Sequence, residues 1–308
     1  MTNDTFTSIK DILSVNTQDT HTLPLVFDSP HSGTFYPEDF EYACDINELR
    51  KLEDAHIDDL FSTAPQYNAA LLCATFARSY IDPNRGIDDI DEQMLKSPWP
   101  EYHFGALAPT ERSEQGIGLI ARDVRKGMPI YKRKLSIDEV SHRISNYYVP
   151  YHKTLEKILN KAHKRHGQVW HINLHSMPSS LAYPKRKNEP YRKHATPCAS
   201  DIVLGDLDGY CCEPSFVQVI QNFWEELGYN VSINDPFKGA EIIANYGHPE
   251  EGRNSLQMEI NRSLYMNEAT GKPTGAYQRF KEHCTQMIAF CAHYCEKQLN
   301  NNISTKHN

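Results

Sequence analysis

The sequence predicts an α/β fold in a single domain, with a mixed, mostly parallel sheet and helices on both of its faces. Apolar runs typical of buried strands alternate from end to end with amphipathic segments typical of helices. A chain of 308 residues with 39% hydrophobic content can bury one sizeable core. We therefore expect an N-terminal arm over residues 1–23, one domain over residues 24–300 and a C-terminal tail over residues 301–308.

The first half of the chain contains two expected strands, over residues 25–28 and 69–76. Between them a helix is expected to begin at the Asp45-x-x-Glu48 capping box and to run to about Ala64. Residues 86–127 are rich in Pro, Gly, Asp and Glu and show little periodicity over a span longer than ordinary connections. Such a stretch is typical of a functional loop or a lid.

The second half is organised around a buried strand over residues 169–174. A helical pattern over residues 136–166, with a break expected near Pro150, precedes it. The polar, basic and Pro-rich residues 179–200 that follow are typical of a second long loop. The remaining expected elements are strands over residues 202–205, 229–233 and 256–260 and helices over residues 214–227 and 275–299.

Composition narrows the classes of partner. The chain has 32 Lys and Arg against 40 Asp and Glu, and a net charge of -8 argues against nucleic acid or an anionic membrane as the main partner. No apolar run approaches the ~20 residues of a transmembrane helix, and the N-terminal segment does not resemble a signal peptide. We therefore expect a cytoplasmic protein. The eight cysteines include no C-x-x-C pair, which disfavours a disulfide framework or a cysteine zinc site.

Two histidines lie where the apolar runs end. His31 follows the run over residues 25–27, and His175 ends the central run. Ligands of open α/β sheets bind beyond the carboxyl ends of the strands. The small side chains of Ser32 and Gly33 would let a ligand approach the backbone there. The alternative for His31 is an ordinary hydrogen-bonded loop residue.

Two neutral imidazoles and one carboxylate satisfy a catalytic zinc, which keeps an open position for water. No H-E-x-x-H or similar compact signature identifies the carboxylate, because position 34, three residues after His31, is Thr34. Asp58 is the candidate, with Asp54 and His56 as alternatives near it on the expected helix. The other interpretation of this acidic cluster is a solvated helix face.

Two arginines are candidates for binding an anionic group. Arg85 ends the rigid turn Asp82-Pro-Asn-Arg85, and a guanidinium suits bidentate binding of a substrate carboxylate. The alternative is an ion pair with Asp88 or Asp89, which are near in sequence. Arg78 allows the same two interpretations.

Glu259 is a candidate general base. It lies within a buried strand, where a carboxylate without a partner is costly, and burial raises a carboxylate pKa toward the range that a base needs. An ion pair with Arg262 is the alternative. On the central strand Asn173 shares a face with His175, and His171 is expected in the core or in support of the site.

Seven segments carry a family resemblance. In these segments the sequence resembles the N-formylglutamate amidohydrolase (deformylase) family, which is similar to the zinc carboxypeptidases and aspartoacylase. Together they span most of the chain, in the family's order. They are SPHSG (29–33), DAHIDDLF (54–61), RSYIDPNR (78–85), INLHSMPS (172–179), LGDLDG (204–209), FKGAEI (237–242) and YGHPEEGRNSLQMEINRSLYM (246–266).

The resemblance implies a zinc-carboxypeptidase-like fold and one zinc ion per chain. It makes His31 and His175 metal ligands, Asn84 and Arg85 the grip on the substrate carboxylate, and Glu259 the general base. We also assign Arg78 to catalysis and Ser176 to substrate binding. The sequence departs from the carboxypeptidase H-x-x-E spacing after His31, and Asn173 stands where relatives often have Asp.

The function that follows is zinc-dependent hydrolysis of an N-formyl or similar small N-acyl amide on an acidic amino acid. N-formyl-L-glutamate, which would give formate and the amino acid, is the model substrate. Two alternatives stay open: a carboxypeptidase-like or other N-acyl amino acid hydrolase, and a non-catalytic binder of a metal or small molecule. The sequence leaves the oligomeric state open.

Overall fold

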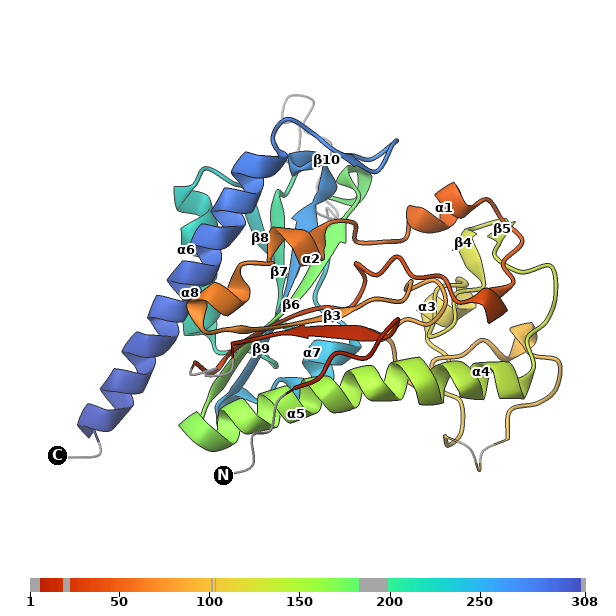
Figure 1. Cartoon of the computed structure of the whole chain (residues 1–308), viewed down its shortest axis with the longest axis horizontal. Coiled ribbons are helices and arrows are strands. Elements are labelled where there is room, and N and C mark those ends of the chain that lie inside the picture. Colours follow the sequence, from red (N-terminus) through yellow and green to blue (C-terminus); the bar gives the residue numbers. More distant parts are fainter. Residues whose placement is uncertain (1–5, 19–22, 101, 103, 183–198, 306–308) are drawn as a thin grey trace, which may run out of the picture. The chain divides into compact units, whose positions relative to one another are not determined.

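The computed structural model describes residues 6–18, 23–100, 102, 104–182 and 199–305. A seven-stranded sheet with strand order β1-β3-β2-β6-β9-β7-β8 organises the chain (Figure 1). Strands β2, β6 and β9 are parallel to one another, β7 is antiparallel to β9, and β8 is parallel to β7. The predicted mixed, mostly parallel α/β fold is therefore confirmed. The strand bounds are β1 Leu13–Asn16, β2 Leu25–Ser29, β3 Ala70–Ala74, β6 Val169–Met177, β7 Ile202–Gly205, β8 Val231–Ile233 and β9 Arg253–Asn261.

The helices vary in length from the single turns α2 and α3 to α8, which has 29 residues. A capping box at Ser136 begins α4, and a π-helical turn, Ile144–Tyr148, joins α4 to α5 just before Pro150, close to the predicted break. No described helix is long and apolar enough to span a membrane. The bounds are α1 Ile46–Arg50, α2 Ile57–Leu60, α3 Glu111–Glu114, α4 Ile137–Arg143, α5 Val149–His166, α6 Pro214–Glu226, α7 Glu241–Tyr246 and α8 Tyr277–Thr305. Two hairpins pair β4 Asp123–Arg125 with β5 Met128–Pro129 and β10 Met266–Asn267 with β11 Lys272–Pro273.

The chain divides into two compact units. The first contains residues 1–15, 29–55 and 72–157, and the second contains residues 16–28, 56–71 and 158–308. His31 and the turn with Arg78 and Arg85 belong to the first unit, and the strands with His175 and Glu259 belong to the second. The domain boundaries at residues 24 and 300 stay a prediction.

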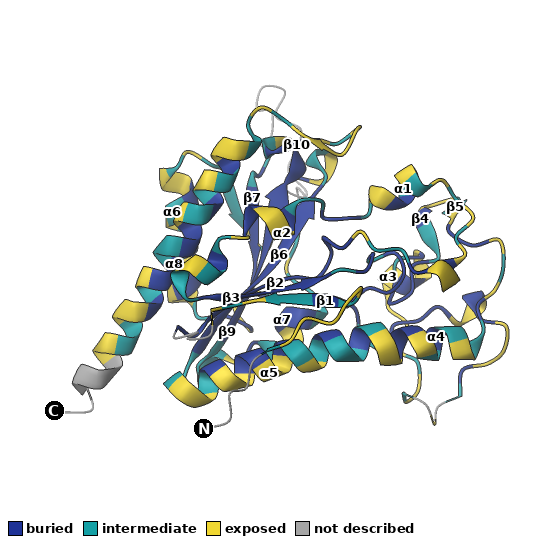
Figure 2. Ribbon diagram, viewed as in Figure 1, coloured by how far each residue is buried: buried dark blue, intermediate teal, exposed yellow. Residues whose placement is uncertain are grey.

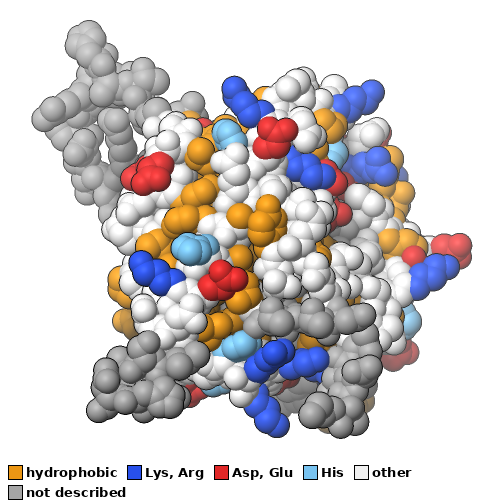
Figure 3. Space-filling view, turned by 60° about the vertical axis from the view of Figure 1, so that its left-hand side comes forward, with side chains coloured by type: hydrophobic (Ala, Val, Ile, Leu, Met, Phe, Trp, Pro, Cys, Tyr) orange, Lys and Arg blue, Asp and Glu red, His pale blue; other side chains and the backbone are white. Residues whose placement is uncertain are grey.

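In the second unit, the two faces of β6 differ in character. The Trp170 ring packs against Phe216 of α6 and Tyr294 of α8, with ring centroids 6.3 and 5.7 Å apart. These two helices lie side by side and expose their outer sides (Figures 1 and 2). On their side of the molecule, charged side chains of both signs lie among hydrophobic ones (Figure 3). Because side chains alternate along a strand, the opposite face of β6 carries His171, Asn173 and His175, which are buried.

The predicted single helix from Asp45 to about Ala64 is wrong. Its sequence forms α1 and α2, separated by a turn in which His56 has a left-handed backbone with φ of 70°. The Asp54 N–H donates to the carbonyl oxygen of His31 at 2.9 Å instead of to a carbonyl one helical turn back. Asp54 therefore lies in a loop, and the helical spacing that paired it with Asp58 does not apply.

The terminal segments also differ from expectation. The arm over residues 1–23 contains β1, an edge strand that sequence reading missed because Leu13 is its single buried residue. At the other end, α8 continues to Thr305. Among the described residues of the loop over residues 86–127, the structure has only the short elements η3 (Glu92–Met94), α3 and β4. Much of the loop over residues 179–200 lies outside the described residues.

Candidate metal centre and active site

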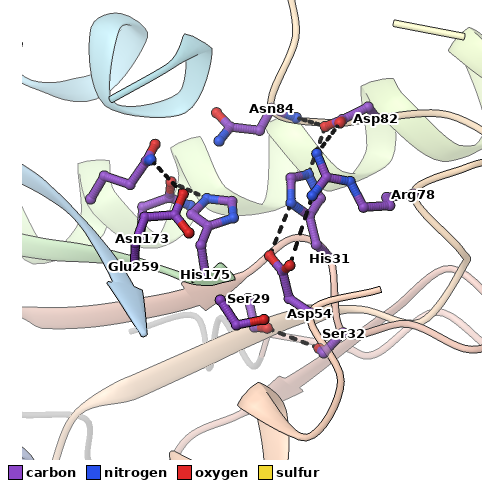
Figure 4. A network of polar contacts seen from close by, with 12 residues as sticks. Ser29, His31, Ser32, Asp54, Arg78, Asp82, Asn84, Asn173, His175 and Glu259 are labelled. Carbon is purple, nitrogen blue, oxygen red and sulfur yellow. Dashed lines mark hydrogen bonds and ion pairs between the residues drawn. The ribbon is translucent and has the colours of Figure 1, made fainter. Parts of the chain in front are cut away.

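His31 lies between two carboxylates in the first unit. Its Nε2 donates to Asp82 Oδ1 at 2.6 Å, and its Nδ1 lies 3.3 Å from Asp54 Oδ2 (Figure 4). All three side chains are at most 4% exposed. The adjacent Gly33 does not leave room for a ligand, because a Cβ there would lie 2.3 Å from the carbonyl oxygen of Phe76. The glycine lets the chain pack against itself and so holds the His31 turn in place.

Arg78 joins the two carboxylates that flank His31. Its Nη2 donates to Asp82 Oδ2 at 2.7 Å, and its Nη1 lies 3.8 Å from Asp54 Oδ1. Burial by itself raises the pKa of Asp82, but Arg78 and His31 hold that pKa well below its usual range. Asp82 is therefore an ionised acceptor for the His31 N–H. Arg78 binds protein carboxylates, and its assignment to catalysis stays a prediction.

Asn84 and Arg85 complete this turn, and both are buried. The Asn84 N–H donates to Asp82 Oδ1, while Arg85 donates from Nη1 to the Asn84 carbonyl oxygen at 2.7 Å and from Nε to the carbonyl oxygen of Ile117 at 3.2 Å. Burial lowers the pKa of Arg85, although the nearby Asp82 raises it. Asp89, the alternative partner, instead accepts hydrogen bonds from Thr110. The structure thus favours neutral partners for Arg85 over the ion pair with Asp89.

In the second unit, His175 and Glu259 are register partners on the parallel strands β6 and β9. They are 3% and 8% exposed, and they point to the same face of the sheet. His175 Nε2 donates to Asn173 Oδ1 at 2.7 Å (Figure 4). Gln257 Nε2 donates to Glu259 Oε1 at 3.0 Å. Each of these two side chains is therefore hydrogen-bonded to an amide side chain two residues earlier on its own strand. The sequence analysis did not predict that Gln257 binds Glu259.

Ser176 lies on the other face of β6, because it is the next residue after His175. Its Oγ accepts from Arg262 Nε at 2.9 Å, and its carbonyl oxygen accepts from Arg262 Nη2 at 3.4 Å. Arg262, which was the alternative partner for Glu259, therefore binds Ser176. The assignment of Ser176 to substrate binding stays a prediction.

Three residues are possible ligands for one metal ion. His31, Asp54 and His175 form a group that could hold such an ion, and all three residues are buried. Asp28 of β2 is the register partner of Asn173 of β6. In the sequence, His31 follows Asp28 by three positions and His175 follows Asn173 by two.

Asp58, the predicted acidic ligand, is exposed on α2 and does not belong to this group of possible ligands, whereas the alternative Asp54 does. His56, the other alternative, donates from Nε2 to the carbonyl oxygen of Gly271 at 2.9 Å. The physical reason is the loop before α2, in which the Asp54 backbone binds that of His31. Sequence periodicity carries no signal for such a contact.

Asp54→Asn is expected to weaken zinc binding, because the amide removes the negative charge of a candidate ligand. The loss should exceed the about 10- to 100-fold typical of residues that only support ligands. The exposed Asp58→Asn is the matched control and should bind zinc like the wild type. Competition with a chelating dye measures both. A folded Asp54→Asn protein with wild-type affinity would show that Asp54 is not a ligand.

The fold and this donor set define the class: an α/β protein with a candidate metal centre of two histidines and one carboxylate. The family model of N-formylglutamate amidohydrolase matches residues 23–266, and the chain belongs to this family of amidohydrolases.

Relatives agree over most of their length. The chain is 27% identical to N-formylglutamate deformylase of Pseudomonas putida and 26% identical to that of Pseudomonas aeruginosa, each over 80% of this chain and 83% of the relative. The crystal structure of N-formylglutamate amidohydrolase from Ralstonia eutropha JMP134 has 43% identity and a TM-score of 0.86, covering 94% of this chain and 99% of that chain.

Proposed function

We propose that this protein is a zinc-dependent hydrolase that cleaves the N-formyl amide of an acidic amino acid such as N-formyl-L-glutamate, releasing formate and the amino acid. The observation that carries this proposal is the group of possible metal ligands His31, Asp54 and His175, with Glu259 paired to His175 in the sheet. Membership of the family and the names of its relatives support the substrate.

The three side chains fit zinc. Two histidines and one carboxylate are a donor set of catalytic zinc sites, which leaves a fourth position open. Two ligands at ~2.1 Å from a tetrahedral zinc are about 3.4 Å apart. The separation of 3.3 Å between His31 Nδ1 and Asp54 Oδ2 is close to this value. Zinc bound there would act as a Lewis acid toward the amide carbonyl and make water a stronger nucleophile.

The chain's own residues supply the proton transfer and the binding of substrate. Glu259 accepts a proton from the attacking water and delivers it to the leaving amine, in the manner of a general base that then acts as an acid. Arg85 and Asn84 bind the α-carboxylate, because a guanidinium donates to both carboxylate oxygens. Arg78 acts in catalysis through the carboxylates beside His31.

Formate release tests the proposal directly. Zinc-loaded protein is incubated with N-formyl-L-glutamate, N-formyl-L-aspartate, N-acetyl-L-glutamate and a short peptide with a C-terminal glutamate. We expect the fastest turnover on a formylated acidic amino acid, loss of activity after chelation and recovery with zinc. Preferred cleavage of the peptide would support a carboxypeptidase. Zinc and ligand binding without turnover of any substrate would support a non-catalytic binder.

Arg85→Lys is expected to lower kcat/KM on carboxylate substrates roughly ten- to a hundredfold. The variant keeps the positive charge but loses the guanidinium group that donates to both carboxylate oxygens. A charge-assisted hydrogen bond is worth ~1.5–3 kcal/mol, which corresponds to this range. The assay compares N-formyl-glutamate with its α-amide. On the α-amide the difference between variant and wild type should largely disappear. An equal loss on both substrates would place Arg85 in support of the turn, through its bonds to the Asn84 and Ile117 carbonyls.

A further inference from the structure

Behind His175 lies a continuous row of buried hydrogen bonds within the second unit. Ser255 Oγ lies 2.7 Å from His171 Nδ1, and His171 Nε2 lies 2.8 Å from Asp28 Oδ1. The same Asp28 oxygen accepts from Asn173 Nδ2 at 2.9 Å, and Asn173 Oδ1 accepts from His175 Nε2 at 2.7 Å. All five residues are at most 3% exposed. The row therefore connects a candidate metal ligand to a carboxylate on the neighbouring strand.

The chemistry of the row allows one orientation of the Asn173 amide. Asp28 Oδ1 accepts, so the amide nitrogen of Asn173 must face it, and the amide oxygen must face His175. An amide oxygen can only accept, so His175 Nε2 carries a hydrogen. A neutral imidazole has one N–H, which makes Nδ1 the nitrogen with a lone pair for a metal.

The sheet fixes the geometry of this arrangement. Asn173 and His175 are two residues apart on β6 and point to the same face, and Asp28 on β2 is the register partner of Asn173. The parallel pairing of β2 with β6 therefore holds the carboxylate beside the amide. No loop conformation is needed to keep the three groups in contact.

We propose that Asp28 and Asn173 are positioning residues that hold His175 in the tautomer with hydrogen on Nε2 and present its Nδ1 to the metal. This inference rests on the proposed function, because it needs His175 to be a ligand. Asp28 acts through Asn173: it fixes the orientation of the Asn173 amide, and the amide oxygen in turn fixes the His175 ring. The group in contact with His175 is therefore a neutral amide and not a carboxylate. The contrasting interpretation is a row that only satisfies buried polar groups, which would affect stability but not metal affinity.

An exchange of the two side chains distinguishes these interpretations. Asp28→Asn allows residue 28 to present either its nitrogen or its oxygen, so the orientation of Asn173 is no longer determined. Asn173→Asp places a second carboxylate beside Asp28 and removes the N–H between them. Each single variant should bind zinc about 10- to 100-fold more weakly, as changes to residues that orient ligands do.

The double variant Asp28→Asn/Asn173→Asp should recover most of this loss. The amide at position 28 then donates to the carboxylate at position 173, which again accepts the N–H of His175. His171 stays satisfied, because its neutral ring can accept at Nε2 and donate from Nδ1 to Ser255. Ser255→Ala is the control, since it shortens the far end of the row and leaves Asp28, Asn173 and His175 unchanged; its zinc affinity should equal the wild type.

The measurements are the zinc Kd from chelator competition and the two-bond 1H–15N spectrum of histidine-labelled, metal-free protein. His175→Gln assigns the His175 signals, and circular dichroism reports folding. We expect hydrogen on Nε2 of His175 in the wild type and in the double variant, and a mixed or changed tautomer in Asp28→Asn. Hydrogen on Nδ1 in the wild type would overturn the inference.

A second result would also overturn it: single variants that fold and keep both the wild-type tautomer and the wild-type zinc affinity. If a single variant does not fold, the tautomer of His175 in the wild-type spectrum and the zinc affinity of the double variant still test the inference. A protein that binds zinc but does not release formate would contradict the proposed function and leave this inference intact. A wild type that binds no zinc would contradict both.

Discussion

His175→Ala is expected to remove bound zinc and, with it, all measurable hydrolysis. The wild type should hold about one zinc per chain, since two histidines and one carboxylate form a catalytic site. Loss of His175 leaves His31 and Asp54, which already lie 3.3 Å apart with Arg78 beside the carboxylate. Two ligands bind zinc much more weakly than three. Elemental analysis of the dialysed protein measures the stoichiometry.

His56→Ala is the matched control for this experiment. His56 is close in sequence to Asp54 and donates to the Gly271 carbonyl oxygen, but it does not belong to the group of three ligand atoms. It should keep about one zinc per chain, as the wild type should. Full zinc stoichiometry in folded His175→Ala protein would show that His175 is not a ligand.

Glu259→Gln is expected to keep the fold and the metal while lowering kcat by about 10²- to 10⁴-fold, the typical contribution of a general base. The amide has nearly the same shape, and its oxygen can still accept from Gln257 Nε2 as Glu259 Oε1 does. It cannot take a proton from water. Single-turnover assays with zinc-loaded protein separate this chemical loss from substrate binding.

Glu268→Gln is the isosteric control for the base. Glu268 accepts from the backbone N–H of Ser179, which the amide oxygen can also do, so activity should stay close to that of the wild type. A metal-loaded Glu259→Gln protein with near wild-type kcat would exclude Glu259 as the base. Loss of zinc in the same variant would indicate instead that Glu259 is a ligand.

The sequence by itself determined the central strands and which polar residues lie near their ends. Runs of mainly apolar residues predict β6, β7 and β9, because strands buried on both faces exclude polar side chains except where these find partners. Parallel strands bring their carboxyl ends to one edge, so His175 and Glu259 follow from strand assignment and direction. The local sequence pattern is therefore sufficient to predict these strands and the residues near their ends.

Only the tertiary structure decided which partners these residues have. Asp54 lies beside His31 because α1 ends at Arg50, and a backbone hydrogen bond from Asp54 to His31 holds the loop that precedes α2. Asp82 binds the His31 ring from 51 positions away. Such contacts depend on how distant segments pack, and neither propensity nor periodicity encodes them. The hydrogen bond from Arg262 to Ser176 is likewise a tertiary contact, because it joins residues from two different segments, and the register of β6 against β9 places Ser176 beside Ile260.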